Sequence, residues 1–167
     1  MPSPVSFSHI AVLGAGAWGT TFAAVMADAG CDVTVWGRDE KVCRQIADEH
    51  RNEAYLPGVE LPARVTASSD ARAVLAGADV VAVAIPSQSA RATLTPLADA
   101  VAGHAVAVSL MKGVELSTDR RMSEVVAESL GIPADRIAVV SGPNLALEIA
   151  RRQPTATVVA STSEATA

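Results

Sequence analysis

The chain has 167 residues, of which half are hydrophobic but only 3% aromatic, and its formal net charge is −5. This length suits one domain whose core is built from aliphatic side chains. The acidic balance excludes a general nucleic-acid or membrane-surface binder, because both classes bind through a basic surface. The first residues, MPSPVSFS, lack the basic start and apolar run of a signal peptide, and no stretch reaches the roughly 18 apolar residues of a membrane helix. We therefore expect a cytoplasmic protein that neither inserts into a membrane nor binds nucleic acid.

Near-continuous runs of Val, Ile and Ala recur along the chain. Such runs are typical of parallel strands that helices cover on both faces. Strands are predicted at residues 9–14, 32–37, 79–86, 104–110 and 136–142, with shorter ones at 65–69 and 155–161. Helices are predicted between them, at residues 17–29, 39–50, 70–76, 87–101, 118–130 and 144–150. The alternation predicts an α/β fold, a doubly wound, Rossmann-type, mostly parallel sheet with helices on both faces.

Several residues carry local structural signals. Asp39 and Asp70 are placed to cap the helices that follow them, and Gly131 to end the helix before it. Residues 52–62 contain two prolines and a glycine, so we expect a loop there, although it holds the only tyrosine, Tyr55.

The two cysteines, Cys31 and Cys43, have neither the number nor the spacing of a disulfide framework or a CxxC metal site. We expect free thiols. The histidines, cysteines and acidic residues form no group with metal-ligand spacing, so no metal site is predicted.

The segment GAGAWG places glycines 14, 16 and 19 directly after the first predicted strand and at the start of the first helix. In this context Gly14 permits a tight turn, Gly16 lets a pyrophosphate approach the backbone, and Gly19 lets helix and strand pack closely. The start of the helix offers free N–H groups and the positive end of its dipole to an anion. The pattern predicts a dinucleotide cofactor.

The end of the second strand, VWGRD, bears on which dinucleotide is bound. A carboxylate there would accept hydrogen bonds from the adenosine ribose and repel a 2′-phosphate. Here Arg38 is placed to pair with a 2′-phosphate, whereas Asp39 is better placed as a helix cap. We predict that NADP(H) is preferred and that NADH remains an alternative cofactor.

Later strands also end in loops at the edge where an open α/β sheet binds its ligand. Pro86, in IPSQ, is expected to border the cofactor. Lys112, in SLMKGVE, is one of only two lysines, and a cation in the cleft of an acidic protein suits a phosphate or carboxylate. The segment SGPNLALE ends a strand at Gly142 and is expected to begin a helix through Pro143.

Taken together, GAGAWGT, VWGRD, NEAYLPG, AIPSQ, SLMKGVE and SGPNLALE, in this order, resemble the N-terminal domain of bacterial NAD(P)-dependent glycerol-3-phosphate dehydrogenase. The resemblance covers the chain from about residue 8 to its end. It implies that NADPH or NADH reversibly reduces dihydroxyacetone phosphate to sn-glycerol 3-phosphate by hydride transfer. The product, sn-glycerol 3-phosphate, would feed phospholipid synthesis. The resemblance also implies cofactor contacts from Ala17, Trp18, Arg38, Tyr55 and Ala146. Gly142 and Asn144 would approach the substrate, and Lys112, the catalytic candidate, would touch both ligands.

Members of this family carry a second, helical domain that contributes substrate contacts, much of the dimer contact and a general acid/base lysine. We expect residues 1–167 to form the dinucleotide-binding domain alone and to bind cofactor with little or no turnover. We expect the parent protein to be a homodimer that acts on a small phosphorylated substrate.

Two alternatives stay open. One is another two-domain NADP dehydrogenase, of the ketopantoate or 6-phosphogluconate type, which would lack the combination of SLMKG and SGPN. The other is a stand-alone dinucleotide-sensing module, which does not need Lys112 or residues 142–144.

Overall fold

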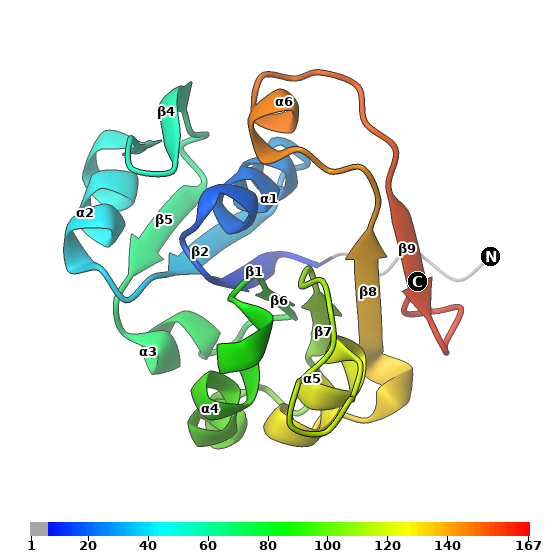
Figure 1. Cartoon of the computed structure of the whole chain (residues 1–167). Coiled ribbons are helices and arrows are strands. Elements are labelled where there is room, and N and C mark those ends of the chain that lie inside the picture. The colour runs from blue at the N-terminus through cyan, green and yellow to red at the C-terminus, as the bar shows by residue number, and fades with distance from the viewer. Residues whose placement is uncertain (1–6) are drawn as a thin grey trace.

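The computed structural model describes residues 7–167. Seven strands form one sheet in the order β5-β2-β1-β6-β7-β8-β9 (Figure 1). Six of these strands run parallel, and β9 pairs antiparallel with β8 at one edge. The predicted doubly wound parallel sheet is confirmed, and both shorter predicted strands form. The strands of the sheet are β1 (His9–Leu13), β2 (Asp32–Trp36), β5 (Val65–Ser68), β6 (Val80–Val83), β7 (Val106–Ser109), β8 (Ile137–Ser141) and β9 (Val158–Ser161).

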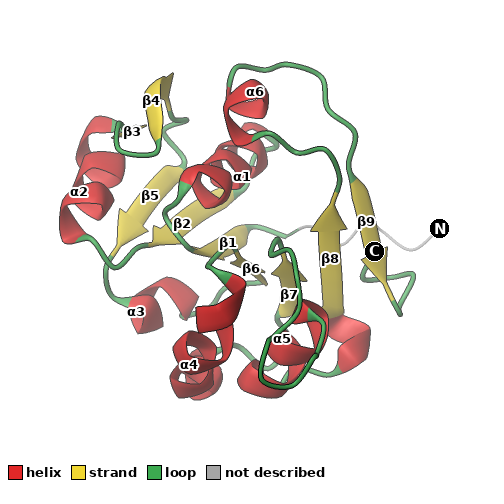
Figure 2. Cartoon of the chain, in the orientation of Figure 1, coloured by secondary structure: helices red, strands yellow, loops and turns green. Residues whose placement is uncertain are grey.

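Helices cover both faces of the sheet (Figure 2). One face packs against α1 (Ala17–Asp28) and α2 (Glu40–Glu49), and the short α6 (Ala146–Ala150) lies against α1. The other face packs against α3 (Ala71–Leu75), α4 (Ala90–Leu94) and α5 (Met122–Leu130). Short 3₁₀ turns complete the connections at η1 (Ser87–Ser89), η2 (Thr95–Ala100) and η3 (Ala134–Arg136).

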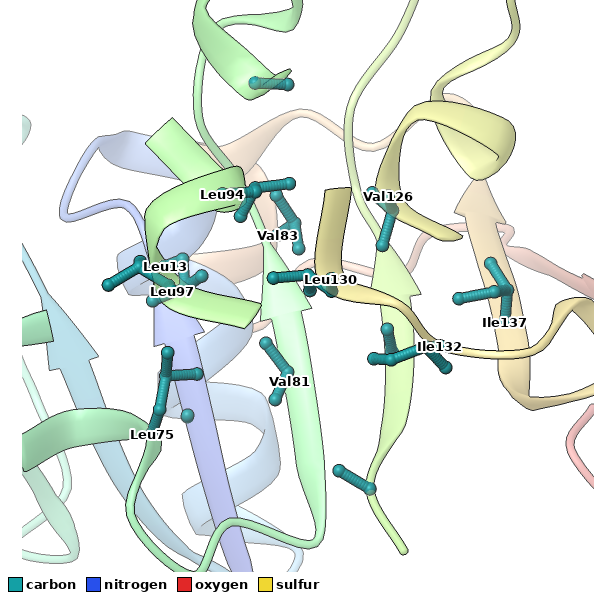
Figure 3. Packing of buried hydrophobic residues seen from close by; sticks show 14 of the residues in the cluster. Leu13, Leu75, Val81, Val83, Leu94, Leu97, Val126, Leu130, Ile132 and Ile137 are labelled. Atoms are coloured by element: carbon teal, nitrogen blue, oxygen red, sulfur yellow. The ribbon is translucent and has the colours of Figure 1, made fainter. Parts of the chain in front are cut away.

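The hydrophobic core consists of two clusters, one on each face of the sheet. Successive strand residues point to opposite faces. Leu13 therefore belongs to the cluster that contains Leu94 of α4 and Leu130 of α5 (Figure 3). Val12 belongs to the opposite cluster, with Phe22 of α1. Small strand side chains such as alanine let these helices sit close to the sheet. Close packing on both faces fixes where each strand ends, and the loops that follow the strands are positioned from there.

Local end signals behave as the sequence predicts. The Asp39 carboxylate accepts a hydrogen bond from the Lys41 N–H (2.8 Å), and Asp70 accepts from Arg72 N–H (3.0 Å) and Ala73 N–H (3.1 Å). Gly131 ends α5 in the left-handed conformation, with φ +66°. Both cysteines are free thiols, with Cys43 buried and Cys31 half-buried.

The expectation of a loop over residues 52–62 was wrong for Asn52 and for residues 56–60, which lie in strands, whereas residues 53–55 form the turn between them. The two strands, β3 (Arg51–Asn52) and β4 (Leu56–Glu60), form an antiparallel hairpin. The hairpin is held by burial, because the side chains of Asn52 and Leu56 are both fully inaccessible to solvent. Pro57 is tolerated because the ladder has only two strands, so an exposed residue need not donate to a further neighbour.

Three predicted helices also need correction. The helix expected from residue 118 begins at Met122, because Asp119 takes a left-handed φ of +55° and residues 114–121 fold back on themselves. The helix expected from residue 144 begins at Ala146, so Pro143 lies outside it. The helix expected over 87–101 divides into η1, α4 and η2, and Pro96 lies at the start of the last of these.

Among residues 7–167, no helix is long and apolar enough to cross a membrane. Within the same range, His, Cys, Asp and Glu side chains do not gather in a group of three that could hold a metal ion.

Candidate functional site

A cleft of about 600 Å³ opens at the carboxyl ends of β1 and β6. These neighbouring strands are where the winding of the sheet changes direction, because the chain proceeds from β1 outward to β2 and β5 and from β6 outward to β7 and β8 (Figure 1). The loops after β1 and β6 therefore diverge, and open α/β sheets bind ligands in the crevice that results. The cleft is lined by residues 14–18, 36–39, 42, 55, 84–87 and 110–112.

The three glycines of the first turn are required for different reasons. At Gly14, φ is +128° and an added Cβ would lie 2.4 Å from the Ala84 carbonyl oxygen, so the turn passes directly against the loop after β6. At Gly19, an added Cβ would lie 1.9 Å from the Gly14 carbonyl oxygen, which is far inside contact distance. At Gly16, by contrast, an added Cβ would meet no atom within 4 Å. Gly14 and Gly19 thus serve packing, and Gly16 leaves open space at the cleft.

The start of α1 faces this open space. Gly16 is the N-cap residue and has no side chain with which to satisfy the first N–H groups of the helix. Ala17 and Trp18 follow it and line the cleft. Free N–H groups at the start of a helix, together with its dipole, form a binding site for an anion such as a pyrophosphate.

The loop after β2 brings Arg38 and Asp39 to the same cleft. The Asp39 carboxylate accepts the capping hydrogen bond from Lys41, so it serves α2. Arg38 is exposed and forms no ion pair within residues 7–167. Tyr55 reaches the cleft from the β3–β4 hairpin with 53% of its surface exposed, which leaves its ring accessible to a ligand.

Pro86 and Lys112 line the cleft from the loops after β6 and β7. The Lys112 Nζ donates a hydrogen bond to the Gly142 carbonyl oxygen at 3.1 Å, which joins the loop after β7 to the loop after β8. Gly142 itself is needed for packing, because an added Cβ would lie 2.4 Å from the Ala156 carbonyl oxygen. The predicted cation and the predicted substrate loop are therefore in contact.

An ion pair between the buried Glu115 and the half-buried Arg91 anchors the loop that carries Lys112. Glu115 is 7% exposed and accepts hydrogen bonds from Arg91 Nε and Nη2, each at 2.9 Å, and a further one from the Thr118 hydroxyl. The Arg91 guanidinium, and after it Thr118, lowers the pKa of the Glu115 carboxyl below its ordinary value. Gln88 reinforces the anchor, because its Nε2 donates to the Val114 carbonyl (2.8 Å) and its Oε1 accepts from Leu116 N–H (3.1 Å).

Ala146 and Asn144 do not line the cleft. The Ala146 carbonyl accepts a hydrogen bond from the Thr21 hydroxyl of α1 (3.1 Å), which ties α6 to α1. The Asn144 Oδ1 accepts from the Thr157 hydroxyl (2.8 Å), so this amide holds residues 155–157 against the loop after β8. Their assignments to cofactor and substrate stay predictions.

The strand order, the crevice at its turning point and the glycine turn define a dinucleotide-binding domain of the Rossmann class. Residues 9–167 match the family model described as "NAD-dependent glycerol-3-phosphate dehydrogenase N-terminus", and the chain belongs to this family. It is an NAD(P)-binding N-terminal domain, as the resemblance in sequence predicted, and not a domain of the ketopantoate or 6-phosphogluconate type.

Similar proteins agree in sequence and in structure. The glycerol-3-phosphate dehydrogenase [NAD(P)+] of Streptomyces griseus is 54% identical over 157 residues, which are 94% of this chain and 47% of that protein. The crystal structure of glycerol-3-phosphate dehydrogenase from Coxiella burnetii superposes with a TM-score of 0.85 at 34% identity, over 94% of this chain and 47% of that one. The enzyme of Saccharomyces cerevisiae gives a TM-score of 0.84 at 29% identity, over 93% and 48%. The chain spans about half the length of the relatives it matches.

Proposed function

We propose that this chain binds NADP(H) in the cleft between the β1 and β6 loops and provides the cofactor-binding half of a glycerol-3-phosphate dehydrogenase. The observation that carries the proposal is the convergence on one cleft of the uncapped start of α1, Arg38 and Lys112. All three present positive charge or N–H donors in a protein of net charge −5. An anionic ligand of extended shape suits this arrangement, and the volume of about 600 Å³ lies within the usual range of small-molecule sites.

The chain's residues fit a dinucleotide phosphate in three places. The N–H groups of Ala17 and Trp18 would hold the pyrophosphate, with Gly16 leaving the space that it needs. Arg38 would pair with the 2′-phosphate, since the neighbouring Asp39 already caps a helix and Arg38 is free of ion pairs within the described residues. Tyr55 and Pro86 would bound the cofactor from the two sides of the cleft.

In the proposed reaction, a cofactor held in this cleft would provide hydride chemistry: dihydroxyacetone phosphate would take up a hydride from NADPH and one proton, giving sn-glycerol 3-phosphate and NADP⁺. Lys112 is the residue of this chain that would touch both ligands, because it lines the cleft and contacts the carbonyl of Gly142. Its ammonium group would bind the substrate oxygens and stabilise negative charge that develops on the carbonyl oxygen. Gly142 and Asn144 would border the substrate. The phospholipid role, the homodimeric full-length protein and the low turnover of the isolated chain stay predictions.

The two lysines of the chain provide a matched test of this function. Calorimetric titration of the chain with NADPH is expected to show one saturable site. In the full-length protein, Lys112→Ala is expected to abolish NADPH oxidation dependent on dihydroxyacetone phosphate, whereas Lys41→Ala, the same charge change on the exposed surface of α2, leaves it intact. Absence of NADPH binding by the wild-type chain, or equal activity of the two variants, would overturn the proposal.

A further inference from the structure

One buried amide connects the β3–β4 hairpin to the glycine turn. Asn52 is fully buried, and its Nδ2 donates to the Ala15 carbonyl oxygen at 3.0 Å and to the Thr20 hydroxyl at 2.8 Å. Ala15 lies between Gly14 and Gly16, and Thr20 lies in α1. The orientation of the amide is determined, because a carbonyl oxygen can only accept a hydrogen bond and so the NH₂ group must face Ala15.

This amide is costly to bury. Its Oδ1 is buried without a hydrogen-bond partner among residues 7–167. A buried polar atom left unpaired destabilises the folded state, and Leu56, also fully buried, already anchors the hairpin through apolar packing. An aliphatic residue at position 52 would anchor the hairpin without that cost. The two hydrogen bonds that Asn52 donates to the turn and to α1 are what only the amide provides.

Those hydrogen bonds add to the backbone bonds that already hold the turn, from Gly14 N–H to the Trp36 carbonyl (2.9 Å) and from Thr20 N–H to the Gly16 carbonyl (3.0 Å). A trans peptide holds its C=O and N–H on opposite edges of one plane, so a bond to the Ala15 carbonyl also sets the direction of the Gly16 N–H. Glycine residues on both sides of Ala15 impose little restriction of their own. The second bond, to Thr20, fixes the first turn of α1 to the same side chain.

We propose that Asn52 is a positioning residue for the dinucleotide: it holds the Ala15–Gly16 peptide and the start of α1 in the orientation that receives the pyrophosphate. This inference rests on the proposed function of the cleft. Asn52 would not touch the cofactor. The hairpin that carries it also carries Tyr55, so one buried side chain ties the pyrophosphate turn to a second wall of the cleft.

The test compares a ligand that contains a pyrophosphate with one that does not. Affinities for NADPH and for adenosine 2′-monophosphate are measured by calorimetry and by NMR titration, for the wild-type chain and for Asn52→Asp, which keeps the shape but replaces the donor with an acceptor. We expect Asn52→Asp to weaken NADPH binding at least tenfold and binding of adenosine 2′-monophosphate less than twofold. Arg51→Gln, an exposed change on the same hairpin, should alter neither.

Equal loss for the two ligands would indicate a general disturbance of the cleft and would overturn the inference, as would unchanged NADPH binding. If circular dichroism shows that Asn52→Asp does not fold, Thr20→Val provides the second variant, since it removes one acceptor of the amide at nearly constant volume. Thr20→Val should show the same selective loss for NADPH, and Thr20→Ser, which keeps the hydroxyl, should restore binding. A wild-type chain that does not bind NADPH refutes the proposed function itself, and the inference with it.

Discussion

Replacing Gly16 by alanine should separate binding from folding. The backbone there has φ −75° and ψ 179°, which an alanine adopts without strain, and the added Cβ meets no atom within 4 Å. Alanine is a poorer N-cap than glycine by about 1 kcal/mol, and the reduced freedom of the unfolded chain offsets this by about 0.4–1 kcal/mol. We expect the free energy of unfolding to change by less than about 1 kcal/mol.

The effect of the same methyl group on binding should be much larger. It occupies the space at the cleft through which a pyrophosphate would approach the start of α1. A displacement of about 1 Å stretches N–H···O bonds from about 2.9 Å to beyond the hydrogen-bonding range. Loss of two charge-assisted bonds of about 1.5 kcal/mol each corresponds to roughly a 100-fold weaker affinity for NADPH.

The assay pairs urea unfolding with NADPH titration, and Gly19→Ala is the contrasting variant. Its Cβ would lie 1.9 Å from the Gly14 carbonyl oxygen, so backbone must move on at least one side, and both stability and binding should fall. Gly16→Ala should lose binding alone. Wild-type affinity in Gly16→Ala would refute the claim that a phosphate group lies against this residue.

Three further changes test other parts of the account. Arg38→Ala should weaken NADPH binding about tenfold, the loss of one charge-assisted bond, and leave NADH binding unchanged; equal losses would contradict the assignment of Arg38 to the 2′-phosphate. Hydrogen bonds from the backbone N–H groups of His9 and Ser8 hold the pKa of Asp79 at about 2, below its ordinary 3.8. Because folding lowers this pKa, the stabilisation by Asp79 is complete above about pH 4 and is lost as the pH falls toward 2. Asp79→Asn should therefore flatten the dependence of urea stability on pH in this window. An unchanged profile would exclude Asp79 as the source of that dependence. In the full-length protein, Glu115→Gln should reduce kcat/KM at least tenfold, because it loosens the loop that carries Lys112. The control, Glu128→Gln, removes the exposed partner of the same Arg91 and should change kcat/KM less than twofold. Equal effects of the two variants would argue against Glu115 as the anchor of the loop.

Much of the fold could be predicted because its determinants are local. Apolar runs mark strands covered on both faces, and Asp39 and Asp70 cap helices through atoms two or three residues away. The β3–β4 hairpin could not be predicted in this way. It depends on the burial of Asn52 and Leu56 against elements that are distant in sequence, and no local pattern records that burial.

The candidate site likewise contains residues that could be placed from the sequence and contacts that could not. Arg38, Pro86 and Lys112 could be placed near the cleft because each follows a strand of a parallel sheet, and the carboxyl ends of such strands meet at one edge. The supporting ties could not be predicted. Asn52 reaches Ala15 across 37 positions of sequence, and Gln88 reaches Val114 across 26. Only the packed structure shows which residues orient the turn and the lysine loop.

The most direct measurement is a fluorescence titration of the wild-type chain with NADPH. The only two tryptophans of the sequence, Trp18 and Trp36, both line the cleft. Binding there should quench their emission saturably at one NADPH per chain. Energy transfer should excite emission from the reduced nicotinamide, and NADP⁺ should abolish that nicotinamide emission by competition. A titration without saturation, or nicotinamide emission that NADP⁺ does not abolish, would contradict the account that this cleft is the cofactor site.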